Sequence, residues 1–149
     1  MVIRKPGGNR RRGNVLIETP VVLIPVLSLI FGVFEYSRLM MDWNLLNNAA
    51  REGCRYAIAN NTSTTISTDV QTRVTTFMAG QTTSFTNFTV SVTGTHQGVS
   101  TPVNNLSAGD MVTVTVSGTY KFMNIIPLAK MPSSFVLKSA VIMGCEGGL

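Results

Sequence analysis

The feature that most constrains this chain is an uninterrupted apolar run near its N-terminus. Residues 15–34 read VLIETPVVLIPVLSLIFGVF, and Glu18 is the only charged residue among these twenty. As a helix the run would span about 30 Å, the thickness of a bilayer core. A buried core helix is the alternative, but a chain of 149 residues offers too little protein to cover a helix that is apolar on all sides. The sequence therefore predicts a membrane-spanning helix over residues 14–34.

The charges that flank this run predict its orientation. Five of the twelve basic residues precede position 13, where no acid occurs, and the remainder of the chain holds seven basic residues against seven acids. By the positive-inside rule the N-terminus lies in the cytoplasm and the C-terminal part lies outside. The basic residues of the arm are Arg4, Lys5, Arg10, Arg11 and Arg12. Because the charge excess is confined to this arm, we expect no nucleic-acid partner.

The helical pattern continues beyond the apolar run. Apolar residues recur at steps of three and four, which predicts an amphipathic continuation over residues 35–60. These residues are Tyr36, Leu39, Met40, Trp43, Leu46, Ala50, Cys54 and Ala57. A helix from Asn14 to Asn60 would be about 70 Å long. Pro20 and Pro25 each remove a backbone hydrogen bond, so a bent or partly unwound segment is expected there.

Residues 61–149 are expected to form a small extracytoplasmic α+β domain. A second helix is predicted from Ser67 or Thr68 to Ala79, before Gly80. Alternation of apolar and hydroxyl residues then predicts strands at residues 88–93 and 112–117, and a third β-like run covers residues 135–143. Gly118 is interpreted as a bulge or bend in the second of these strands.

Two long connections separate the predicted strands. The segment Gly94–Asp110 contains three glycines, a proline and the only histidine, His96, and is predicted to be an exposed loop. The segment Ile125–Pro132 contains two prolines and is predicted to be a second loop.

The residues that open the apolar run carry a resemblance to a known family. Gly13-Asn14-Val15-Leu16-Ile17-Glu18 follows three arginines and resembles the prepilin signal of type IV pilins. The runs at residues 34–38 (FEYSR), 48–57 (NAAREGCRYA), 109–110 (GD) and 139–143 (SAVIM) are similar to those of the TadE-like pseudopilins of tight-adherence pili. The resemblance covers nearly the whole chain and is strongest over residues 12–57.

This resemblance implies a processed, assembled subunit. Residues 1–13 would be a basic prepilin leader, cut between Gly13 and Asn14 by a prepilin peptidase, a membrane aspartic peptidase. The fold implied is pilin-like, with the long N-terminal helix packed on a small antiparallel β-sheet. The implied partners are this peptidase, other pilin or pseudopilin subunits, the pilus assembly platform and membrane lipid. The implied location is the bacterial cytoplasmic membrane, in or at the base of the pilus.

Glu18 is the residue of the apolar run to which a role is assigned. An ionisable group at this depth costs about 3 kcal/mol on insertion scales, so it calls for a partner or a route to the interface. Cleavage after Gly13 would create an amine four residues away. The resemblance implies that Glu18 pairs with the amine of a neighbouring subunit during assembly. The alternative is a carboxylate at the headgroup boundary without a specific role.

Cys54 and Cys145 are the only cysteines. If the domain is exported, the two predict a disulfide that closes a loop of about 90 residues and stabilises the fold by about 4 to 5 kcal/mol on the chain-entropy model. Two buried free thiols are the alternative. Two cysteines and a distant His96 lack the spacing of metal ligands, so no metal and no cofactor is expected.

No catalytic residues are recognised, because His96 stands alone, no paired carboxylates occur and no phosphate-binding loop is present. We therefore expect a protein that is not an enzyme. The leading prediction is a minor pseudopilin-like subunit of a tight-adherence (type IVb-like) pilus. The alternative is an uncleaved, signal-anchored envelope protein whose exposed β-domain, through the segment Gly94–Asp110, acts as an adhesion or binding module.

Overall fold

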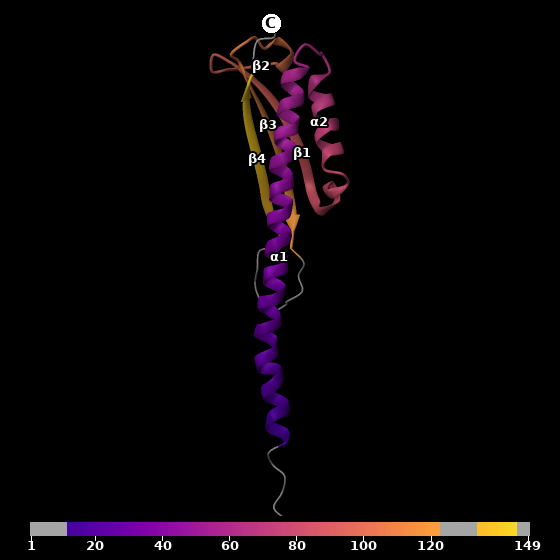
Figure 1. Ribbon diagram of the computed structural model, residues 1–149, viewed down its shortest axis with the longest axis vertical. Coiled ribbons are helices and arrows are strands. Elements are labelled where there is room, and N and C mark those ends of the chain that lie inside the picture. Colours follow the sequence, from indigo (N-terminus) through magenta and orange to yellow (C-terminus); the bar gives the residue numbers. More distant parts are fainter. Residues whose placement is uncertain (1–11, 123–133, 146–149) are drawn as a thin grey trace, which may run out of the picture. The chain divides into compact units, whose positions relative to one another are not determined.

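The computed structural model describes residues 12–122 and 134–145, and its elements follow in the order helix, helix, strands (Figure 1). They are α1 (Arg12–Ala59), α2 (Ile66–Phe77), η1 (Gln81–Ser84), β1 (Phe85–His96), β2 (Val99–Thr101), η2 (Val103–Asn105), β3 (Met111–Lys121) and β4 (Ser134–Gly144). The chain divides into two compact units within α1, between Tyr36 and Ser37. The predicted α+β class is confirmed.

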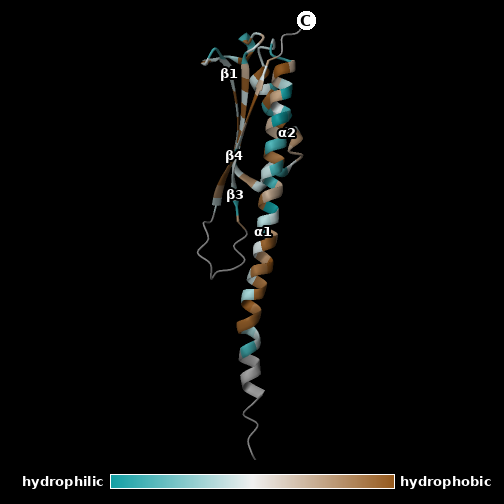
Figure 2. Cartoon of the chain, turned by 60° about the vertical axis from the view of Figure 1, so that its left-hand side comes forward, coloured by the Kyte–Doolittle hydropathy of each residue, from teal (hydrophilic) through white to brown (hydrophobic). Residues whose placement is uncertain are grey.

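The first unit contains the apolar half of α1. Its large apolar side chains are exposed from Val21 to Phe34, and Figure 2 shows this stretch as predominantly hydrophobic. The helix is continuous through Pro20 and Pro25, so the predicted partly unwound segment is wrong. Each proline removes one hydrogen bond, and the other bonds of the flanking turns maintain the helix. The hydroxyl of Ser28 donates to the carbonyl oxygen of Ile24 at 2.8 Å, which satisfies this polar group on the helix itself.

The second unit is built on a four-stranded antiparallel sheet with the order β2-β1-β3-β4. Along β3 the buried residues alternate with partly exposed ones, as expected for a sheet with one covered face. The later part of α1 and α2 cover that face (Figure 1). The core between the layers includes Leu46, Ala50 and Cys54 of α1, Val70, Val74 and Met78 at α2, and Val112, Val114, Val116, Tyr120 and Leu137 of the sheet.

The predicted second helix and third strand agree with the structure to within two residues at each end, as α2 and β4 show. The chain leaves α2 through Ala79 and Gly80, both at positive φ. The predicted loop Ile125–Pro132 lies outside the described residues.

The bulge predicted at Gly118 is wrong, because β3 is continuous and the irregularity belongs to β1. The pairing of β1 with β3 shifts between Thr86 and Thr89, and Asn87 takes a φ of 55° there. Gly118 lies opposite this shift, where a Cβ atom would come within 2.9 Å of Phe85. The glycine is therefore required by the aromatic ring that packs over it.

The prediction of an exposed loop over Gly94–Asp110 is also wrong. β1 extends to His96 and forms a hairpin with the short strand β2 through Gln97 and Gly98, both at positive φ. Val103, Leu106 and Asp110 are buried after it. A three-residue strand and isolated apolar residues have too little periodicity to be recognised in the sequence.

Candidate functional site

One helix of the described residues is long and apolar enough to cross a membrane, and it lies near the N-terminus. Gly13 and Asn14 belong to the first turn of α1, which begins at Arg12. Glu18 is exposed one turn later and borders a shallow apolar hollow on the helix surface. The hollow is lined by Glu18, Thr19, Val22, Leu23 and Val26. The acidic side chain thus stands at one end of an otherwise apolar surface.

Within the second unit, the stretch of α1 from Ala49 to Ala57 packs closely against α2 and the sheet. A Cβ atom on Gly53 would lie 2.8 Å from Cγ2 of Val74 and 3.2 Å from Cγ1 of Val114. The structure therefore leaves no space for a side chain where α1 meets α2 and β3. Sequence reasoning assigned Gly53 no role, although small residues at steps of three and four (Ala50, Gly53, Ala57) signal close helix packing.

Glu52 joins α1 to α2 through an ion pair. Its Oε1 accepts from Nη2 of Arg73 at 2.8 Å and from Nε at 3.1 Å. This partner on a second helix was not predicted from the sequence. Both side chains keep solvent access, so the pair orients the helices more than it stabilises them.

Asn47 joins α1 to the edge strand β4. Ser139 is buried, and its hydroxyl donates to Oδ1 of Asn47 at 2.6 Å. Ser139 is the first residue of the run at 139–143 noted in the sequence. Its hydrogen bond connects this run to α1.

Within the second unit, Arg38 of α1 contacts the sheet near the start of that unit. Its guanidinium lies 5.2 Å from the centroid of the Tyr120 ring, a cation–π contact. Phe122 packs edge-on against the same ring, with the centroids 5.3 Å apart. An aromatic cluster therefore marks the place where α1 first meets β3.

The two cysteines are free and buried in the structure, which differs from the predicted disulfide. The thiol of Cys54 donates to the carbonyl oxygen of Val141 at 3.1 Å, whereas Cys145 follows the end of β4, four residues further along the chain. Burial raises the pKa of both thiols, and the nearby Asp110 carboxylate raises that of Cys145 further. The pairing of Cys54 with Cys145 stays a prediction for the exported protein.

The sequence suggested that His96 stands alone, but in the structure it has a partner. Its Nδ1 lies 2.6 Å from Oδ1 of Asp110, whose Oδ2 accepts from the backbone N–H of Ser107 at 2.7 Å. The Ser107 N–H, and after it His96, lower the pKa of the Asp110 carboxyl. Asp110 also binds the C-terminal end of β4 through its backbone, because its carbonyl oxygen accepts from the Cys145 N–H at 2.7 Å. This hydrogen bond joins the residue before β3 to the residue after β4.

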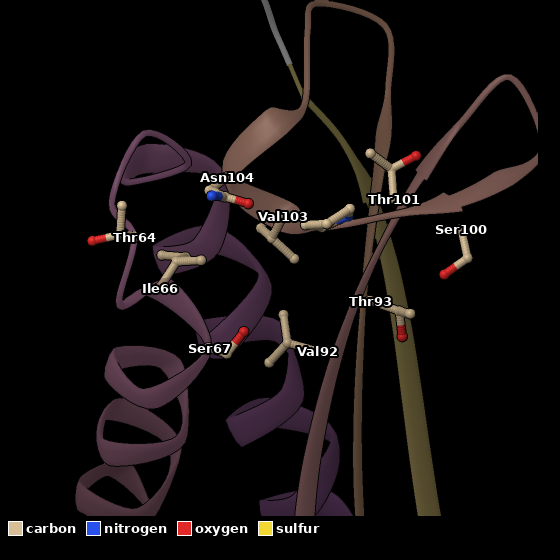
Figure 3. A pocket seen from close by; sticks show the side chains of 10 residues that line it. Thr64, Ile66, Ser67, Val92, Thr93, Ser100, Thr101, Val103 and Asn104 are labelled. Atoms are coloured by element: carbon tan, nitrogen blue, oxygen red, sulfur yellow. The ribbon is translucent and has the colours of Figure 1, made fainter.

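A groove lies between the start of α2 and the β1–β2 hairpin (Figure 3). Its lining includes Thr64, Ile66, Ser67, Val92, Thr93, Ser100, Thr101, Val103 and Asn104, a set with hydroxyls and an amide but no charge. Such a surface offers neutral hydrogen-bonding groups only. Within residues 12–122 and 134–145, no group of three or more His, Cys, Asp or Glu side chains is placed to hold a metal ion.

Comparison with known proteins places the recognisable part of the chain on α1. The family model described as TadE-like protein matches residues 13–55. The match begins at Gly13, contains Glu18, and ends beyond the packing contact of Gly53 and the ion pair of Glu52. Curated proteins and solved structures give no match. Over this segment, which is less than half of the chain, the protein is similar to TadE-like proteins, and its long apolar helix fits a single-pass membrane protein.

Proposed function

We propose that this chain is a minor pseudopilin-like subunit that takes part in the assembly of a tight-adherence pilus and has no enzymatic activity. What carries the proposal is the family match over residues 13–55 on one continuous helix. This helix is apolar on all sides in the first unit and packs on a folded domain in the second. Such a subunit can hold one half in lipid, or among neighbouring helices, while the other half carries the domain.

In this proposal the basic leader is removed after Gly13 by a prepilin peptidase, in the cytoplasmic membrane with the N-terminus inside. Replacing Gly13 with leucine should leave the full-length precursor in the membrane, because the bulky side chain blocks the scissile bond. The matched control is Gly8→Leu, in the same basic arm, which should be processed normally. N-terminal mass spectrometry of the membrane fraction measures the result. A mature chain that starts at Asn14 in the Gly13→Leu variant would contradict the proposal.

Glu18 is proposed to pair with the N-terminal amine of a neighbouring subunit. The pairing would offset the cost of a carboxylate in an apolar surface, because two opposite charges attract each other strongly where the dielectric constant is low. Glu18→Ala should spare membrane insertion and processing but reduce surface pili, whereas Thr19→Ala, one residue along, should do so far less. Counting pili on cells that carry each variant, with the chain's membrane level measured beside it, separates assembly from stability. Normal piliation in Glu18→Ala would remove this role.

A second candidate function is that of an uncleaved, membrane-anchored binding module. The groove beside the β1–β2 hairpin favours it, because its hydroxyl and amide groups face solvent without charge (Figure 3). Substituting Ser100 and Asn104 with alanine should then abolish adhesion while pili remain normal in number. Under the leading proposal the same variants leave both properties unchanged.

A further inference from the structure

The end of the second unit where β3 stops and β4 begins carries exposed apolar and basic side chains. Lys121 is exposed and pairs with Ser134 across the ladder. Next to them Phe135 is 49% exposed and Val136 is 64% exposed. Neither β3 nor β4 contains an acid. We call Lys121, Phe122, Phe135 and Val136 the basal patch.

Three contacts of α1 show which end of the sheet this is. Arg38 lies over Tyr120, next to the basal patch, whereas Asn47 contacts Ser139 and Cys54 contacts Val141 further along β4. The helix therefore starts along the sheet at the end with the basal patch and moves away from it.

Arg38, which contacts Tyr120 beside the basal patch, lies close to the apolar segment along the chain. Arg38 is only four residues beyond Phe34, and a helix rises about 1.5 Å per residue. This nearness follows from the covalent chain and holds for any arrangement of the two units.

The charge and chemistry of the patch fit a lipid surface. Aromatic and branched apolar side chains enter the boundary between headgroups and acyl chains, and lysine places its ammonium among phosphates. The basal patch is thus positive and partly apolar, and Arg38, beside it, follows a predicted membrane span by a few residues.

We propose that the basal patch docks on the anionic phospholipid surface of the membrane that the apolar helix crosses. The inference rests on the membrane anchoring in the proposed function and adds a second lipid contact, made by the folded domain. Because the helix tethers the domain, a contact too weak to bind a free protein is sufficient. The contact would hold the domain at the headgroups before assembly.

The test uses the full chain reconstituted into vesicles of phosphatidylcholine and phosphatidylglycerol that contain lipids brominated on the acyl chains. Trp43→Phe removes the only tryptophan, and a single reporter is then placed by Val136→Trp. The matched control is Ile142→Trp, on the same strand and face, 61% exposed, and about 20 Å away along β4. A reporter in the apolar helix, Leu29→Trp, measures anchoring.

Bromolipid should quench Val136→Trp at least about twofold more than Ile142→Trp, because a docked side chain lies within about 10 Å of the acyl boundary. Adding Lys121→Gln, or omitting phosphatidylglycerol, should reduce this quenching. Equal quenching at the two positions overturns the proposal, as does quenching that ignores lipid charge. Shielding of Val136→Trp that disappears when the protein is diluted in the membrane would identify a second copy as the occupant instead, and overturn it too.

Failure of the two proposals is distinguishable in the same vesicles. If Leu29→Trp is quenched and Val136→Trp is not, the helix is anchored and only the docking of the domain is refuted. If Leu29→Trp is not quenched, the membrane anchoring fails and the docking inference fails with it.

Discussion

Gly53 shows most directly how a single residue positions the long helix. Gly53→Ala would place a methyl group 2.8 Å from Val74 Cγ2, so we expect the free energy of unfolding of the domain to fall by about 1 to 3 kcal/mol. Denaturant unfolding in detergent micelles measures it. Gly32→Ala, in the same helix with nothing within 4 Å of the new Cβ, is the matched control and should change little.

The clash at Gly53 can also be relieved from the other side. In the double variant Gly53→Ala/Val74→Ala the free energy of unfolding should fall by less than the sum of its decreases in the two single variants. The reason is that alanine at position 74 lacks the clashing methyl group. Strict additivity would contradict this explanation of the glycine.

Asp110 makes the fold sensitive to acid. Its folded pKa lies below the ordinary value, through the Ser107 N–H and His96, so its stabilising effect is present above about pH 4 and is lost as the pH falls through the folded pKa. Asp110→Asn should therefore be less stable than the parent chain near neutrality, and the difference should shrink on acidification. Unfolding measured between about pH 2 and pH 6 tests this. In His96→Ala the acid dependence should persist in weaker form, since Ser107 still donates.

At the scale of elements, side-chain hydrogen bonds of Asn47 and Cys54 join α1 to β4, and the Glu52–Arg73 ion pair joins α1 to α2. Ser139 is buried where it donates to Asn47 at 2.6 Å, so Ser139→Ala should cost about 1 to 3 kcal/mol of unfolding free energy. Ser91→Ala, an exposed serine of β1, serves as the control and should stay within about 0.5 kcal/mol. Equal effects would mean that the hydrogen bond does not secure the helix to the edge strand.

The Glu52–Arg73 pair should contribute less than that hydrogen bond. Its side chains are 25% and 53% exposed, and exposed pairs couple by about 0.2 to 1 kcal/mol. A double-mutant cycle with Glu52→Gln and Arg73→Gln measures the coupling. A value well above 1 kcal/mol would show that this pair, and not the packing at Gly53, holds α2 against α1.

At the scale of the whole molecule, the two cysteines lie at the same end of the sheet, since Cys54 contacts Val141 near the end of β4 and the Cys145 N–H donates to Asp110 just before β3. Both thiols are buried and have raised pKa values, so the folded chain should resist alkylation, and unfolding without reductant should expose two reactive thiols. Mass spectrometry counts the labels. A mass two daltons low, with no label, would instead establish the Cys54–Cys145 bridge that the sequence predicts.

Features that depend on neighbours in the chain can be predicted from the sequence alone. The long helix, α2 and three of the strands follow from periods of 3.6 and two residues, and the family resemblance is strongest over residues 12–57. The bulge, the partner of His96 and the need for glycine at position 53 could not be predicted in this way, because they depend on which distant segments become adjacent in the folded chain. The bulge lies in β1, opposite Gly118, whose Cβ position is covered by Phe85, and His96 has a partner because the β1–β2 hairpin brings it to Asp110. Gly53 must be glycine because Val74 and Val114, 21 and 61 residues away, reach it only in the folded chain.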